Sequence, residues 1–393
     1  MTATPNPAKA LRHIEQLWPR LIRRNPQDSG TLIGLPRPYF VPRDGGANGG
    51  MFQEMYYWDS YFISLGLVGT PLASGIVDIA ENFAALVERF GLIPNGSRYY
   101  FLSRSQPPFF TRQIALALAN GLAPDPAWLR RMAALAEREL ETVWMGEHQP
   151  HHRRVYAGLS RYFDINYLDM LASCESGWDH STRCDDAWLD HVPVDLNSLL
   201  YVAEVDLADF ADRLGDAARA AHWRARAMAR QATLQRLFWD EDAGLFLDFN
   251  FRRELRNPLP SLATFYPLWA GWATPDQAAR IVAQWLPRFL QPGGCVCSLD
   301  TRAGRQWAWP NGWAPLQWLV ASGLDRYGFA AEARDVRRRW VRTCVEVFER
   351  DGAMHEKYNV VEPDVPGEAG LYGHLQGFGW TNGVLVDFVR QGL

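Results

Sequence analysis

Two carboxylates with distinctive neighbours are the first candidates for chemistry in this sequence. Asp179 follows directly on Trp178, and Glu356 directly precedes Lys357. A carboxyl held against an indole is desolvated, which raises its pKa and suits a general acid. The two residues lie far apart in the chain, so spacing alone does not pair them. Each also has an ordinary explanation as a surface or capping carboxylate.

Two loops combine aromatic rings with polar side chains. Residues 48–61 place four such side chains at or before the start of a predicted helix, namely Glu54, Tyr56, Trp58 and Asp59. Residues 93–109 hold amide and guanidinium groups among aromatic rings, at Asn95, Arg98, Arg104 and Gln106. Rings for an apolar face and polar groups for hydroxyls together suit a polyhydroxyl ligand. The alternatives are a helix N-cap for Asp59 and a stacked, salt-bridged structure for the second loop.

The composition argues against nucleic acid and membrane partners. The 393 residues carry a formal net charge of -4 and contain no long run of Lys or Arg. Neither a phosphate backbone nor an anionic membrane is therefore an expected partner. The chain is rich in rings, with 17 Trp, 14 Tyr and 20 Phe. Such rings suit the flat apolar faces of sugars, although many of them must simply fill the core.

The cysteines and the amino terminus bear on metals and on the cellular compartment. Five cysteines are an odd number, and they lack the paired spacing of a zinc site or a disulfide scaffold. We expect reduced thiols and no metal. Residues 1–22 lack the apolar core of a secretory signal, and no later stretch is long and apolar enough to cross a bilayer. These features predict a cytoplasmic protein.

Helical periodicity of apolar residues dominates the chain. It is clearest over residues 71–90, 126–145, 196–238 and 327–349. Further helices are expected over residues 8–22, 59–67, 110–119, 261–268, 275–289 and 313–323. Between them lie long loops rich in Gly, Pro, Asn and aromatic residues, at 43–57, 92–108, 174–185, 301–314 and 352–380.

Ten to twelve helices joined by long loops predict an all-α fold, namely an (α/α)6 barrel whose function lies on the loops. Alternating β-branched residues are scarce. The alternative is a helical-repeat solenoid, but the chain shows no fixed period of about 34 or 40 residues. No linker or change of composition divides the sequence, so residues 1–393 are expected to form a single domain.

Several blocks, in order along the chain, resemble the trehalase family, glycoside hydrolase family 37. Trp58-Asp59 with the preceding loop resembles the first family signature, and residues 306–315 resemble the second. Other blocks that match the family pattern are residues 93–109, 176–179, 192–197, 356–358 and 377–383.

The resemblance implies an (α/α)6 barrel, no cofactor, and hydrolysis of an α-glycoside with inversion. Asp179 matches the family's general acid and Glu356 its general base, with an implied carboxyl separation of roughly 6.5 to 9.5 Å. Matches to substrate-contacting positions are Trp58, Asp59, Asn95, Arg104, Ser105, Gln106 and Gly177. The predicted substrate site also includes Phe52, Tyr56, Trp178, Trp313, Gln317, Tyr372 and Trp380.

The chain departs from the family pattern at positions that help to hold the sugars. Met51 stands where the first signature has Arg, Ala308 where the second has Asp, and Leu371 within a Gly-Glu-Tyr element. An Arg-Pro-Glu segment expected after residues 159–164 is absent. Since a site that binds a substrate hydroxyl discriminates strongly through it, these losses predict a changed leaving group. Trehalose is the best single substrate, and glucosylglycerol, glucosylglycerate and mannosylglycerate, of the kind cleaved in glycoside hydrolase family 63, are alternatives.

Two other classes of protein stay open at this point. A non-catalytic sugar-binding protein would also lose contact residues, although the retained pair of carboxylates argues against it. An epimerase would need proton-transfer groups at a ring carbon, for which His180, His355 and His374 are the candidates. A small α-glycoside and water are the expected partners, and the sequence does not specify an oligomeric state.

Overall fold

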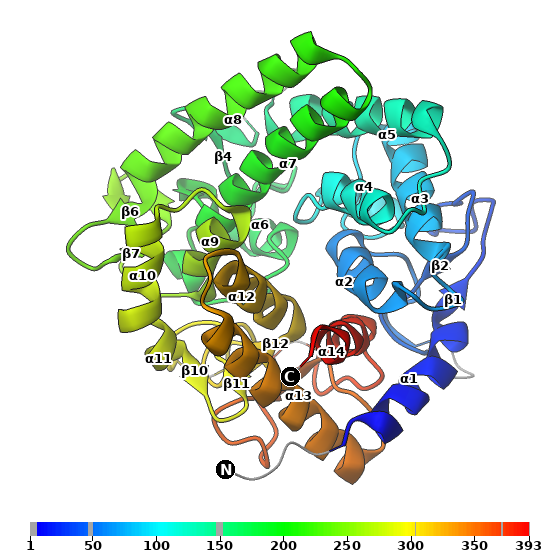
Figure 1. Ribbon diagram of the computed structural model, residues 1–393, viewed down its shortest axis with the longest axis vertical. Coiled ribbons are helices and arrows are strands. Elements are labelled where there is room, and N and C mark those ends of the chain that lie inside the picture. Colours follow the sequence, from blue (N-terminus) through cyan, green and yellow to red (C-terminus); the bar gives the residue numbers. More distant parts are fainter. Residues whose placement is uncertain (1–5, 46–49, 147–151, 303, 371, 393) are drawn as a thin grey trace.

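Twelve helical positions form two concentric rings in the computed structural model, which describes residues 6–45, 50–146, 152–302, 304–370 and 372–392 (Figure 1). The inner ring contains α2 (Tyr57–Leu67), α4 (Phe110–Ala119), α7 (Val194–Arg213), α9 (Tyr266–Ala270), α12 (Ala314–Arg326) and α14 (Gly379–Gln391). The outer ring contains α1 (Ala8–Leu21), α3 (Gly75–Phe90), α5 (Pro126–Glu139), α8 (Ala217–Phe238), α10 (Pro275–Gln284) with α11 (Leu286–Phe289), and α13 (Ala330–Asp351).

The two rings differ in how their residues are buried. Every residue of the inner helix α2 is buried. On the outer helix α8, by contrast, only a stripe that includes Trp223, Leu234 and Phe238 is buried. A helix surrounded by other helices needs apolar or small residues on all sides, whereas a surface helix needs one apolar stripe. An apolar period in the sequence can therefore reveal the outer helices more readily than the inner ones.

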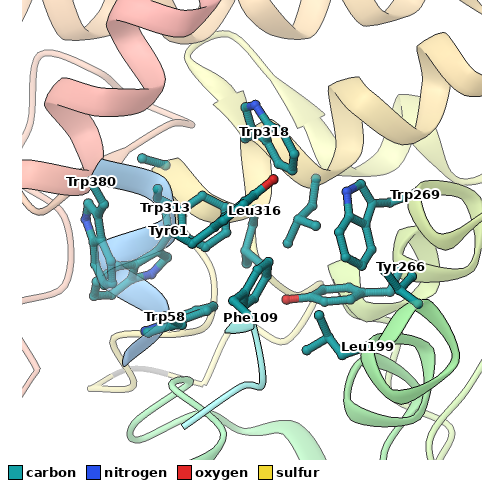
Figure 2. Packing of buried hydrophobic residues seen from close by; sticks show 14 of the residues in the cluster. Trp58, Tyr61, Phe109, Leu199, Tyr266, Trp269, Trp313, Leu316, Trp318 and Trp380 are labelled. Carbon is teal, nitrogen blue, oxygen red and sulfur yellow. The ribbon is translucent and has the colours of Figure 1, made fainter. Parts of the chain in front are cut away.

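Aromatic side chains fill the middle of the barrel (Figure 2). Tyr61 of α2 stacks on Phe109 with ring centroids 4.8 Å apart, and it meets Trp318 of α12 edge-on at 5.8 Å. Phe109 in turn lies 6.0 Å from Trp269 of α9. The middle of the barrel is therefore a packed core.

Short antiparallel strands decorate the loops. They are β1 (Ile22–Arg23), β2 (Tyr39–Phe40), β3 (Arg154–Tyr156), β4 (Leu159–Ser160), β5 (His191–Val192), β6 (Trp239–Asp240), β7 (Leu245–Phe246), β8 (Phe249–Asn250), β9 (Leu255–Arg256), β10 (Leu290–Gln291), β11 (Gly294–Cys295), β12 (Asn311–Trp313) and β13 (Lys357–Asn359). The pair β12–β13 matters most here, because its register sets Trp313 opposite Lys357. It thereby joins two loops that are far apart in the sequence.

The prediction of an (α/α)6 barrel is confirmed, and the solenoid alternative is wrong because the ring closes. The last helix, α14, packs against the first inner helix, α2. Two predicted helices are each divided in the structure. Residues 196–238 separate into α7 and α8 at Gly215, which adopts a left-handed φ of 76°. Residues 275–289 separate at Trp285, where Pro287 follows in α11.

Two helices were not predicted from the sequence. The short α6 (Asp169–Glu175) lies in a segment with no clear period, and α14 begins inside a stretch predicted as loop. The first turn and a half of α14 contains Gly379, Thr381, Asn382 and Gly383, which are weak helix formers. Its burial on most sides removes the amphipathic pattern as well. No helix within the described part of the chain is both long and apolar enough to cross a membrane.

Candidate active site

One pocket of about 330 Å³ collects residues from most of the loops singled out in the sequence. Both candidate carboxylates, Asp179 and Glu356, line it. So do most of the predicted substrate residues, namely Phe52, Tyr56, Trp58, Asp59, Asn95, Arg104, Gln106, Gly177, Trp313, Tyr372 and Trp380. The barrel thus brings together side chains from both ends of the sequence.

Asp179 enters the pocket from a tight turn after α6. Gly177 has a φ of 73°, and a Cβ there would lie 2.6 Å from Cζ2 of Trp58, so that only glycine fits. The Tyr372 hydroxyl donates to Asp179 Oδ2 at 3.1 Å, and Gln306 Nε2 donates to the Asp179 carbonyl oxygen at 3.1 Å. Burial raises the pKa of the Asp179 carboxyl to about 7, although Tyr372 and Arg104 both act to lower it. Asp179 is thus largely protonated at slightly acid pH.

Glu356 lies immediately before β13 and is paired with a cation. Lys357 Nζ donates to Glu356 Oε2 at 2.8 Å and also to the carbonyl oxygen of Gly373 at 2.9 Å. The Trp380 indole holds the Glu356 carbonyl oxygen at 3.1 Å. Burial raises the pKa of Glu356, and the charge of Lys357 opposes this rise. The two carboxyls therefore face one pocket in different environments, which is how one site can keep an acid and a base together.

Asp59 is a third carboxyl in the pocket. It lies inside the first turn of α2, where the N-cap position is Tyr56 and the helix has no side-chain cap, so the capping explanation does not apply. Burial raises the pKa of Asp59 well above its usual value, and the charges of Glu356 and Asp179 raise it further. A protonated Asp59 can donate a hydrogen bond to a sugar hydroxyl.

Three indoles stack on one another next to the segments that carry the two candidate carboxylates. Trp178 stacks on Trp307 with centroids 5.5 Å apart, and Trp307 stacks on Trp313 at 3.8 Å with planes within 4°. Arg183 lies over the Trp178 ring at 4.7 Å, and the Lys357 ammonium lies 5.3 Å from the Trp313 ring. We call Trp178, Trp307 and Trp313 the tryptophan column. It connects the Asp179 loop to the Lys357–Glu356 pair.

The polar residues of the 93–109 loop hold the pocket wall in shape. Asn95 Nδ2 donates to the carbonyl oxygens of Ser105 and Cys174, both at 3.1 Å. Gln106 Oε1 accepts from the Trp58 backbone N–H at 3.2 Å, which leaves its amide NH2 group facing away from that bond. Arg104 pairs with Asp164 at 3.1 Å. The salt-bridged explanation of this loop therefore applies to Arg104, and the ligand-binding one stays a prediction.

Three of the predicted substrate residues do not line the pocket. Ser105 is buried behind it, and its hydroxyl donates to the carbonyl oxygen of Ile93 at 2.6 Å. Trp178 is wholly covered within the tryptophan column. Gln317 of α12 binds the backbone N–H and C=O of Cys295, both at 2.7 Å, and so fastens β11 to α12. These side chains support the pocket from outside.

Several lining residues were missed. Glu54 and Arg98 lie in the two loops that the sequence singled out, although neither was assigned to the site. Gln306 and Trp307 lie in the 306–315 block, whose resemblance to the second family signature was the signal that could have found them. The remaining lining residues are mostly apolar, and they include Tyr100 and Phe101 of the aromatic 93–109 loop and Phe378 of the 377–383 block, none of which was assigned to the site.

The departures from the family pattern fall in different places. Met51 lines the pocket and is 51% exposed. Ala308 is buried, does not line the pocket, and uses its carbonyl oxygen to accept from the Asn311 N–H at 2.9 Å. Leu371 lies outside the described residues. The segment that lacks Arg-Pro-Glu instead exposes apolar side chains at Ile165, Tyr167, Leu168 and Met170.

Histidines and clusters of metal ligands are both missing from the described lining of the pocket. The described residues contain no group of three or more His, Cys, Asp or Glu side chains able to hold a metal ion. His180, His355 and His374, the candidates for epimerase chemistry, are not among the lining residues. The pocket thus presents carboxyls, amides and indoles.

A helical toroid with two carboxyls in different hydrogen-bond environments of one aromatic pocket is the arrangement expected of a glycoside hydrolase. Comparison with protein families agrees, because the family model described as trehalase matches residues 2–170 and 164–392. The chain belongs to the trehalase family of glycoside hydrolases. This membership sets aside the non-catalytic and epimerase alternatives.

Individual relatives cover nearly the whole chain. A periplasmic trehalase from Salmonella paratyphi B is 35% identical over 98% of this chain and 74% of its own length. One from Escherichia coli O1:K1 is 34% identical over the same shares. Among solved structures, the neutral trehalase of Saccharomyces cerevisiae matches with a TM-score of 0.79 and 28% identity over 91% of this chain and 74% of its own. A mannosylglycerate hydrolase from Thermus thermophilus shares the fold, with a TM-score of 0.70 and 19% identity over 98% of this chain and 100% of its own.

Proposed function

We propose that this protein hydrolyses α,α-trehalose with inversion, with Asp179 as general acid and Glu356 as general base. The observation that carries the proposal is the unequal environment of the two carboxyls. Asp179 is held by a neutral hydroxyl and has its pKa raised to about 7, whereas Glu356 is hydrogen-bonded to the Lys357 ammonium. An inverting hydrolase needs one protonated and one ionised carboxyl on opposite sides of the sugar ring.

The proposed reaction follows from these protonation states. Asp179 gives its proton to the glycosidic oxygen as the bond from that oxygen to the anomeric carbon breaks. Water attacks the anomeric carbon from the other face, and Glu356 takes the proton that this water loses. Asp179 is left ionised and Glu356 protonated, and exchange with solvent restores both. The first-formed glucose is the β-anomer.

Trehalose is favoured as substrate by the family and by the two curated relatives described above, both of which are named periplasmic trehalases. The neighbour named mannosylglycerate hydrolase is only 19% identical, so it supports the fold and not the substrate. Within the pocket, the buried Asp59 and the amide of Gln106 are the groups that we assign to hydroxyls of the glucose that is released as the β-anomer.

A turnover assay with defined variants tests the two assignments. Asp179→Asn and Glu356→Gln are each expected to lower kcat on trehalose by about three orders of magnitude or more, because each removes a proton-transfer group. Proton NMR of the wild-type reaction should show β-glucose forming before α-glucose. Glucosylglycerol, glucosylglycerate and mannosylglycerate belong in the same assay as competing substrates.

The matched control is Glu175→Gln, a buried carboxyl four residues before Asp179 whose ion pair is with Arg153 and which does not line the pocket. This variant is expected to melt at a lower temperature, and where it is folded to keep most of its turnover. If Asp179→Asn or Glu356→Gln retains wild-type kcat, the corresponding assignment is wrong. Simultaneous release of both anomers, or α-glucose first, contradicts inversion.

We also propose a single domain and a cytoplasmic location, for which the support differs. Contacts of α1 with α13 and α14 link the described amino-terminal helix to the carboxyl-terminal helices, which supports one folding unit. All five cysteines are free and four of them are buried, as a reducing compartment allows. The curated relatives named above are periplasmic enzymes, and cell fractionation against periplasmic and cytoplasmic markers distinguishes the two compartments.

A further inference from the structure

Gln306 lines the pocket beside the candidate acid, and the reaction proposed above gives it no part. It lies in the loop before β12 and is only 1% exposed. Two side chains fix its backbone, because Asn311 Nδ2 and the Trp313 indole both donate to the Gln306 carbonyl oxygen, at 2.9 and 3.0 Å. The Gln306 side chain is therefore anchored at its base and reaches toward Asp179 from a fixed point.

The bond to Asp179 sets which way the Gln306 amide is turned. Gln306 Nε2 donates to the Asp179 carbonyl oxygen at 3.1 Å. A carbonyl oxygen can only accept, so the amide cannot be flipped to place Oε1 there. Oε1 is left as a buried acceptor, to which no side chain or backbone group in the described ranges donates. Because a buried acceptor without a donor is costly, this oxygen has a use for a donor supplied by a ligand.

A glycine keeps this oxygen from being covered by a side chain. Gly370 has a φ of 60°, and a Cβ there would lie 2.5 Å from Gln306 Oε1. Gly370 is itself exposed, so Gln306 packs against the outer rim of the pocket. A disaccharide enters from solvent, which places its leaving sugar nearer this rim than its glycone. Gln306 Oε1 is therefore on the side of the leaving sugar, next to the acid that must reach the glycosidic oxygen.

We propose that Gln306 Oε1 accepts a hydrogen bond from a hydroxyl of the leaving glucose, which makes Gln306 a specificity-determining residue of this site. The inference rests on the proposed function, since it takes trehalose as the ligand. One amide then holds both partners of the proton transfer, because its Nε2 binds the backbone of Asp179 and its Oε1 binds the leaving sugar. A site built to bind a substrate hydroxyl rejects analogues that lack it, since its own buried group is then left unpaired.

The test compares two ligands that share a glycone and differ in the leaving group. Trehalose carries hydroxyls on its leaving sugar, whereas methyl α-D-glucopyranoside carries none beyond the glycone. Binding is measured by isothermal titration calorimetry in a Glu356→Gln background, which prevents turnover. Adding Gln306→Met, which keeps the length of the side chain and removes its amide, is expected to raise the Kd of trehalose about tenfold. The Kd of methyl α-D-glucopyranoside should stay within about twofold.

A purely structural role of Gln306 would weaken both ligands by the same factor, and that result overturns the proposal. An unchanged Kd of trehalose overturns it as well. If a thermal melt shows that Gln306→Met is unfolded, Gln306→Asn takes its place, because it keeps the amide but is one methylene too short to reach both partners. The same two outcomes apply to it.

The matched control is Gln231→Met on α8. Gln231 also donates its amide to a backbone carbonyl oxygen, that of Trp272 at 3.2 Å, and it is not a lining residue of the pocket. Both Kd values should be unchanged in this variant. Hydrolysis of trehalose by the wild type is measured separately. Its absence overturns the proposed function, whereas its presence with equal losses for the two ligands overturns only the role of Gln306.

Discussion

At the scale of single residues, the pocket separates two chemically similar carboxyls by their hydrogen-bond partners. Tyr372 gives Asp179 one neutral donor, and Lys357 gives Glu356 a charged one. Burial raises the pKa of both carboxyls, so the partners decide how far each rises. If Asp179 is the acid and Glu356 the base, Asp179 sets the alkaline limb of a bell-shaped pH dependence and Glu356 sets the acid limb. Tyr372 therefore acts on the alkaline limb, and Lys357 acts on the acid limb.

This division predicts that two substitutions move different limbs of the pH dependence of kcat/KM. Activity should fall as pH rises through about 7, where Asp179 loses its proton. Tyr372→Phe removes a hydrogen bond that lowers the pKa of Asp179, so the alkaline limb should move to higher pH. Lys357→Met removes the cation that lowers the pKa of Glu356, so the acid limb should also move to higher pH. Each shift is expected to be about half to one pH unit.

The measurement is a full pH profile of kcat/KM on trehalose for the wild type and both variants, at temperatures where all three are folded. The wild-type acid limb serves as the internal control for Tyr372→Phe, and the alkaline limb for Lys357→Met. Movement of the same limb in both variants, or of neither, contradicts the assignment of acid and base.

At the scale of elements, loops that are distant in the sequence are held together by stacked rings and one small ladder. The tryptophan column links the loop after α6 to the segment before β12, and β12 pairs with β13 beside Glu356. The separation between the carboxyls of Asp179 and Glu356 depends on this alignment, and small displacements of catalytic groups are costly. Trp307 lies in the middle of the column, where it contacts Trp178 of the loop after α6 and Trp313 of β12.

Replacing Trp307 should therefore impair catalysis more than it impairs folding. We expect Trp307→Leu to lower kcat by about two orders of magnitude and Trp307→Phe by about one, because phenylalanine keeps part of the stack. Near-ultraviolet circular dichroism reports the loss of the closely stacked pair Trp307–Trp313, and a thermal melt reports folding. Trp285→Phe, an indole that bonds Ala243 away from the pocket, should keep wild-type kcat. A folded Trp307→Leu variant with wild-type kcat would exclude a positioning role for the column.

At the scale of the whole molecule, the ring of helices closes because α14 packs against α2. The two helices pack so closely that a Cβ at Gly66 would lie 2.6 Å from the Cα of Gly383. A Cβ at Gly383 would overlap the carbonyl oxygen of Phe62. The contact between backbones requires glycine on both helices, and it also sets Trp380 of α14 against the Glu356 carbonyl oxygen.

Gly383→Ala is accordingly expected to destabilise the fold by about 3 kcal/mol or more, since overpacking at a backbone contact cannot relax cheaply. Thermal and denaturant unfolding measure the loss, which should appear as one transition if the chain is a single domain. Gly50→Ala is the control, because its Cβ would come no closer than 3.6 Å to any other atom. Equal melting temperatures for the two variants would show that α14 does not close the ring through this contact.

The sequence by itself determined the helical class, the outer helices, and the loops that carry the two carboxylates. Outer helices such as α3 and α13 show an apolar stripe, and a stripe is a local pattern. Glycine and aromatic clusters likewise mark the functional loops locally. Order along the chain then allowed the family resemblance to pair Asp179 with Glu356.

Only the tertiary structure decided the rest. The inner helix α14 has no stripe because it is buried on most sides, so its period gave no signal. Three contacts in the pocket join residues that lie between 44 and 193 positions apart. They are Asp179 with Tyr372, Trp178 with Trp307, and Glu54 with Arg98. Contacts of this kind exist only after the ring has closed, because no local sequence pattern specifies which loops will meet at the end of a barrel.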